Sequence, residues 1–124
     1  MSDTLVLYIG SILIFFWGIA HIIPTKAVVR GFGALSQENR RILTMEWVAE
    51  GLTLCFVGML VLATTILGRP PSRASLIVYR GSSVMLLVMA GWTLLTGART
   101  SVVPIKICPV VKTVVAILFF LGSS

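Results

Sequence analysis

Glu46 and Glu50 lie four residues apart in the stretch MEWVAEG, and the 124-residue chain contains only four acidic residues. Residues at this spacing share one face of a helix, one turn from each other. Trp17 and the single histidine, His21, have the same spacing earlier in the chain. A carboxylate and an imidazole, which ordinarily titrates near neutral pH, could together move a proton on a substrate. Glu50, Glu46 and His21 are therefore the candidate catalytic residues.

Lys112 is a second chemically informative residue, because the sequence ends twelve residues later at Ser124. Twelve residues are too few to cross a bilayer, so Lys112 is expected inside the last membrane-spanning segment. Counted from Pro104, Lys112 lies roughly 12 Å along a helix, and Glu50 lies roughly 10 Å along its own helix from Leu43. The two charges are thus expected at matching depths.

A charge inside a membrane is costly and usually finds a partner. We predict that Glu50 pairs with Lys112, with His21 and Glu46 closer to the membrane interface. One alternative remains open on the sequence alone. Lys112 could extend toward the nearer surface, and both glutamates could lie at headgroup level beside Trp47 as an interfacial anchor.

The elements that must position these residues are apolar. The chain is 57% hydrophobic and 11% charged, with a mean hydropathy of +1.04, whereas a soluble domain carries about 25% charged residues. Four apolar blocks, at about 4–24, 42–67, 75–97 and 102–122, each approach the ~20 residues that a spanning helix needs. Strict two-residue alternation is missing, which disfavours a barrel. The expected fold is all-α, a four-helix transmembrane bundle forming one membrane domain over residues 1–124.

The net charge of +6 comes from basic residues that lie mostly between the apolar blocks. Six lie in the first and third connections, namely Lys26, Arg30, Arg40, Arg41, Arg99 and Lys106. Three lie in or just after the second connection, namely Arg69, Arg73 and Arg80. This asymmetry predicts both termini outside, in a bacterial cytoplasmic membrane. Membrane lipids are the expected partners of these charges, and nucleic acid is not.

Local signals add detail to the connections and helix contacts. Pro24 should end the first helix, Thr25 should cap a short amphipathic turn, and Ser36 should cap the second long helix. Small residues predict close approach between helices. They are Gly10, Gly18, Gly51, Gly58, Gly81, Ser83 and Gly91.

Several chemistries are not indicated. The sequence contains no HExxH, no GxSxG and no glycine-rich phosphate loop. Cys55 and Cys108 are widely separated, so we expect inert thiols and no metal site. With one histidine, the chain alone could not provide two histidine ligands to a haem. The only bound group that we consider is a lipid or a quinone, with Trp17, His21, Glu50 and Lys112 as candidate binding residues.

Three segments, WGIAHIIP, FGALSQENR and MEWVAEGLTLCFVG, resemble the DoxX-like small four-helix membrane proteins over about residues 10–65. This resemblance implies a four-helix bundle of a kind that sometimes accompanies membrane oxidoreductases that pass electrons to quinone. The chain has no CxxC that could make it a redox carrier, so the resemblance favours an accessory role.

The leading functional hypothesis is a non-catalytic accessory subunit of a larger membrane complex or a lipid- or quinone-binding protein. A bundle this thin is expected to form a homo-oligomer or to bind other membrane subunits. One alternative is a membrane enzyme that acts on a lipophilic substrate by proton transfer through Glu50 or Glu46 and His21. Another is a small proton-coupled transporter or channel.

Overall fold

The computed structural model describes residues 3–68 and 71–124, which are helical throughout apart from short connections and contain no strand. The helices are α1 (Asp3–Ile22), α2 (Thr25–Gly31), α3 (Gln37–Leu67), α4 (Arg73–Leu95), the 3-10 turn η1 (Gly97–Arg99) and α5 (Val103–Gly122). The predicted all-α class is confirmed. Arg69, one of the basic residues of the second connection, lies outside the described residues.

Four of these helices, α1, α3, α4 and α5, are long and apolar enough to cross a membrane. Their outward faces carry large apolar side chains; for example, Phe16 is 61% exposed and Phe56 is 62% exposed. Water would penalise such a surface, whereas lipid tails match it. The chain is therefore a small integral membrane protein built as a helical bundle.

The helix bounds agree within two residues with those expected, except that α3 begins at Gln37 and not near residue 42. The sequence predicted a helix only over its apolar stretch, but the polar segment QENRR just before that stretch belongs to the same helix. Ser36 caps it as predicted, because its Oγ accepts a hydrogen bond from the Asn39 N–H at 3.1 Å. The cap predicted at Thr25 is wrong. Its hydroxyl donates to the carbonyl of Ile22, at the end of α1.

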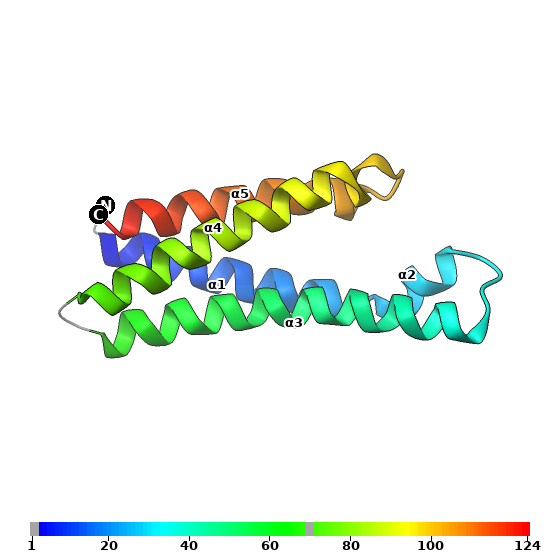
Figure 1. Cartoon of the computed structure of the whole chain (residues 1–124), viewed down its shortest axis with the longest axis horizontal. Coiled ribbons are helices and arrows are strands. Elements are labelled where there is room, and N and C mark those ends of the chain that lie inside the picture. Colours follow the sequence, from blue (N-terminus) through cyan, green and yellow to red (C-terminus); the bar gives the residue numbers. More distant parts are fainter. Residues whose placement is uncertain (1–2, 69–70) are drawn as a thin grey trace.

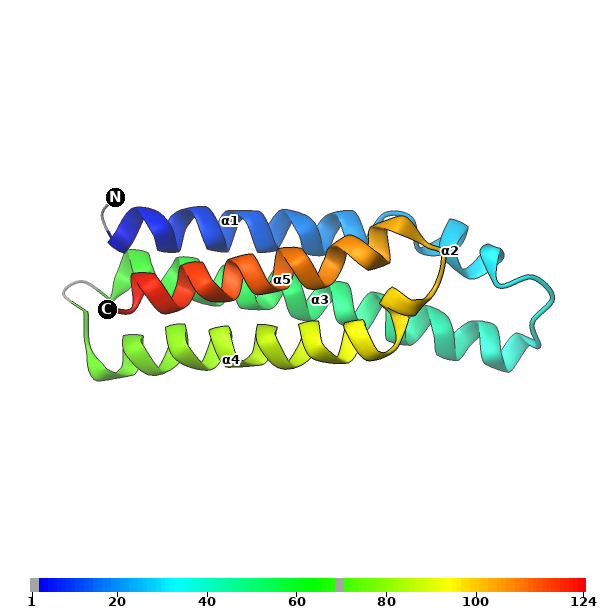
Figure 2. The same cartoon turned by 90° about the horizontal axis from the view of Figure 1, so that it is seen from above.

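The long helices pack as two pairs, α1 with α3 and α4 with α5, and α5 also lies against α1. Figure 1 shows the pairs close together where both termini lie and diverging toward α2 and η1. Figure 2, from above, shows α1, α5 and α4 side by side. We call the divergent region, formed by α2, η1 and the beginnings of α3 and α5, the α2 end. The opposite region is the terminal end.

Glycines set the contact between α1 and α3. A Cβ on Gly58 would lie 2.7 Å from the Ser11 carbonyl oxygen, and a Cβ on Gly18 would lie 2.7 Å from the Gly51 carbonyl oxygen. The predicted close approach is therefore present here. It is absent at Gly81 and Gly91 of α4, where a Cβ would meet no atom within 4 Å.

Gly58→Ala should destabilise the bundle, because the new methyl group meets the backbone of α1, and overpacking costs about 1–3 kcal/mol. Gly81→Ala is the matched control on α4, where the methyl group meets nothing. Thermal unfolding in detergent should show a lower midpoint for the first variant and an equal or higher one for the second. Equal midpoints for the two variants would contradict this account of the α1–α3 contact.

Candidate functional site

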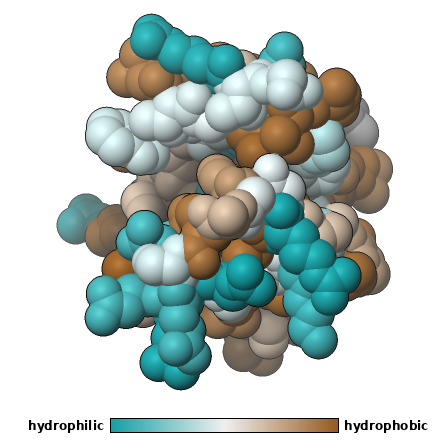
Figure 3. Space-filling view, turned by 90° about the vertical axis from the view of Figure 1, so that its right-hand side faces the viewer, coloured by the Kyte–Doolittle hydropathy of each residue, from teal (hydrophilic) through white to brown (hydrophobic). Residues whose placement is uncertain are grey.

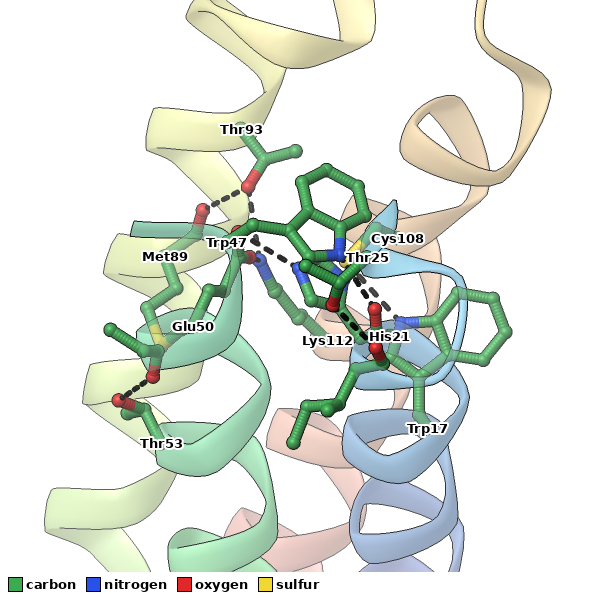
Figure 4. Close-up of polar contacts among 12 residues, drawn as sticks. Trp17, His21, Thr25, Trp47, Glu50, Thr53, Met89, Thr93, Cys108 and Lys112 are labelled. Atoms are coloured by element: carbon green, nitrogen blue, oxygen red, sulfur yellow. Dashed lines mark hydrogen bonds and ion pairs between the residues drawn. The ribbon is translucent and has the colours of Figure 1, made fainter. Parts of the chain in front are cut away.

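The side chain of Lys112 is fully buried on α5 and reaches two other helices. Its Nζ donates to Oε1 of Glu50 on α3 and to Oγ1 of Thr93 on α4, the latter at 3.0 Å. Figure 4 shows these three side chains converging between their helices. The Glu50–Lys112 ion pair predicted from matching depths is therefore present.

Thr93 is a site residue that the sequence did not reveal. Its hydroxyl accepts from Lys112 and donates to the carbonyl of Met89 at 2.9 Å, so both of its hydrogen-bonding roles are used. A signal was available in the lysine itself. An ammonium group has three donors, so a fully buried lysine needs more acceptors than one carboxylate oxygen.

The apolar core begins next to the ion pair, on the side of the terminal end. Leu54, Leu86 and Val115 are fully buried there, from α3, α4 and α5 respectively. Such a medium strengthens the attraction between opposite charges and also makes an unpaired charge expensive. Lys112 and Glu50 therefore depend on each other.

His21 lies in the last turn of α1 beside the ion pair, with its side chain only 9% exposed. Its Nε2 is 3.7 Å from Oε2 of Glu50, which is too far for a hydrogen bond, and it has no other hydrogen-bond partner among the described residues. The imidazole stacks on Trp47 with ring centroids 4.0 Å apart and planes inclined by 14°. The Trp47 indole N–H also donates to the His21 carbonyl at 2.7 Å, which fixes the end of α1 to α3.

Trp17 and Glu46 are the other two residues that the sequence predicted for the site. The Trp17 indole N–H donates to the Cys108 sulfur at 3.3 Å, which joins α1 to α5 one turn before Lys112. Glu46 is exposed on α3, one turn from Glu50 toward the α2 end. It forms no ion pair with any residue that the structure describes. The structure thus brings His21, Glu50 and Lys112 together and leaves Glu46 outside this cluster.

A cavity of about 1000 Å³ adjoins the cluster and extends from the level of Thr53 to α2 and η1. All three tryptophans of the chain, Trp17, Trp47 and Trp92, line it. Its wall is mostly apolar, and its charged or ionisable side chains include His21, Glu46 and Glu50. Hydropathy and spacing do not predict this cavity, because it arises where the two helix pairs diverge.

Basic side chains surround the α2 end. Figure 3 looks onto this end and shows hydrophilic groups gathered around apolar ones. Six exposed basic residues belong to its elements and connections, namely Lys26, Arg30, Arg40, Arg41, Arg99 and Lys106. Within residues 3–68 and 71–124, no cluster of histidine, cysteine and acidic side chains could hold a metal ion.

Glu50→Gln should lower the free energy of unfolding by about 3 kcal/mol, because it leaves the fully buried ammonium of Lys112 without a negative partner. Lys112→Met should cost less, since Glu50 is partly exposed and can be hydrated. The double variant should be more stable than the sum of the two effects implies. Denaturant titration in mixed micelles measures all three, and strictly additive losses would contradict a direct pair.

Comparison of the chain with known protein families, with curated proteins and with solved structures gives no match in any of the three. The resemblance to DoxX-like proteins therefore stays a prediction. A function therefore has to be inferred from the geometry of the cavity and of the charged cluster beside it.

Proposed function

We propose that this integral membrane protein binds a lipophilic molecule in the cavity at the α2 end. The proposal rests on a cavity of about 1000 Å³ that has an apolar, aromatic wall and a polar cluster on one side. Ligand sites are typically clefts of ~300–1,000 Å³ with mostly apolar walls and a few placed polar groups. This cavity is at the upper end of that range, which suits a lipid-sized ligand.

The arrangement of helices supports entry from the bilayer. Among the neighbouring long helices, α3 and α4 have the slightest contact, and both contribute side chains to the cavity wall. A lipophile dissolved in the membrane could pass between them without crossing water. Its apolar part would meet the tryptophans, and its polar part would meet the cluster at Glu50 and His21.

Binding fits the cluster better than proton transfer does. A general base has to gain and lose a proton, but a protonated Glu50 would leave the buried ammonium of Lys112, which donates to its Oε1, without a counter-ion. Glu46, the other candidate base, lies one turn away and outside the cluster. The internal charge balance of Glu50 and Lys112 favours a site that holds a ligand over one that exchanges protons with it.

We also propose that the α2 end faces the cytoplasm and that both termini are outside. The six exposed basic residues at the α2 end support this orientation. In a variant whose native cysteines are replaced by serine, Ser124→Cys should react with a membrane-impermeant maleimide in intact spheroplasts. Ser101→Cys, in the connection before α5, should react only after permeabilisation. The reverse labelling pattern would contradict the orientation.

The tryptophans make ligand binding measurable. Methyl dibromostearate, an apolar probe whose bromine atoms quench tryptophan, should quench the purified protein saturably, because all three tryptophans line the cavity. Ala49→Phe places a bulky ring in the cavity wall and should weaken this binding about tenfold, or about 1.4 kcal/mol.

Ala63→Phe is the control, since Ala63 is exposed on the same helix but does not line the cavity. This variant should bind the probe as the unmodified protein does. Quenching that rises without saturation, or that falls equally in both variants, would contradict binding in the cavity.

A further inference from the structure

Two polar atoms of the cluster face each other without a bond between them. Nε2 of His21 is buried and has no hydrogen-bond partner among the described residues. Oε2 of Glu50 likewise accepts no hydrogen bond from any residue that the structure describes. Lys112 donates to the other carboxylate oxygen, Oε1. The two atoms are 3.7 Å apart, and both residues line the cavity.

We propose that the bound lipophile is an alcohol, whose hydroxyl group bridges these two atoms. This inference rests on the proposed function. A gap of 3.7 Å is too long for a direct hydrogen bond but allows one oxygen to lie about 2.8 Å from both atoms. A hydroxyl group can accept from the imidazole N–H and donate to the carboxylate at once.

The charges of the cluster select against ionic headgroups. Glu50 is already paired with Lys112, so this pair leaves no unmatched charge beside His21 for a headgroup to neutralise. Glu46, which also lines the cavity, lies one turn away toward the α2 end. A carboxylate or phosphate headgroup would meet repulsion from Glu50, and an ammonium headgroup would compete with Lys112 for the same carboxylate. An uncharged hydroxyl group avoids both costs.

The imidazole is also held in place before any ligand arrives. Trp47 stacks on one face of the His21 ring and binds the His21 backbone carbonyl. With the ring so fixed, little conformational freedom is lost when Nε2 donates to a ligand. His21 is thus a binding residue that recognises the headgroup, while the tryptophan-lined wall receives the apolar part.

Three matched probes test the inference on the unmodified protein, each competing with methyl dibromostearate for the cavity. Farnesol carries the hydroxyl group, farnesyl methyl ether keeps only the acceptor oxygen, and farnesene has neither. Farnesol should bind about tenfold more tightly than the ether, because the ether cannot donate to the carboxylate of Glu50. Equal affinities for farnesol and the ether would overturn the inference. The same result is expected if a water molecule, and not the ligand, bridges the two atoms.

His21→Phe and His21→Gln test the other half of the bridge. His21→Phe keeps an aromatic ring beside Trp47 but removes the nitrogen, so the advantage of farnesol over farnesene should fall about tenfold. His21→Gln retains a donor and should restore part of that advantage. Because His21 lines the cavity, farnesene is measured in each variant as the baseline, and a loss of farnesol affinity that farnesene shares equally would count against recognition by His21.

The two proposals fail in different ways. If farnesene competes saturably but farnesol has no advantage over it, the cavity binds lipophiles and the hydroxyl inference alone is wrong. If methyl dibromostearate itself does not quench saturably, the proposed function is wrong and the inference falls with it. If His21→Phe does not fold, the comparison of farnesol with its ether on the unmodified protein decides the matter.

Discussion

Lys112 is an ammonium group held inside a membrane, and its need for a partner constrains three helices at once. Glu50 has to lie at the same depth on α3, and Thr93 has to present its hydroxyl from α4. Losing either acceptor would leave a donor of the fully buried Lys112 side chain unsatisfied, which is costly. The ion pair therefore fixes the α4–α5 pair against α3 at this level of the bundle.

Away from the ion pair, the helices are held together by close packing. Along α1 and α3, glycines let the two backbones touch, so this pair is closely packed up to the level of Gly51. Beyond that level, α1 ends soon after His21 while α3 continues, and the α4–α5 pair diverges from both. The cavity follows from this geometry: close packing on the terminal side of the ion pair and diverging helices on the other side leave a space walled by aromatic rings.

The sequence predicts the part of this structure that depends on counting along a helix. Matching depths made Glu50 the expected partner of Lys112, because the rise per residue of a helix is nearly constant, although they left open that both side chains reach the headgroups instead. The same count placed Glu46 one turn nearer the membrane interface than Glu50, and Glu46 forms no ion pair with any residue that the structure describes. The hydrogen bond of Thr93 with Lys112 and the stacking of Trp47 on His21 depend on the rotation of each helix about its own axis. Hydropathy does not encode that rotation.

If the cavity binds a lipophile as proposed, its place along the bundle has a consequence for how strong that binding has to be. The helix α3, at 31 residues, is about 46 Å long, whereas α1 and α5, at 20 residues each, are about 30 Å long and match the hydrocarbon core. The cavity wall includes residues near the ends of these shorter helices, so in a bilayer that α1 and α5 span it would lie where the hydrocarbon meets the headgroups. A lipophile partitions into that layer by itself, and its local concentration there far exceeds its concentration in water. Modest intrinsic affinity would then suffice for occupancy, and the mole fraction of the ligand in the membrane would decide how full the site is.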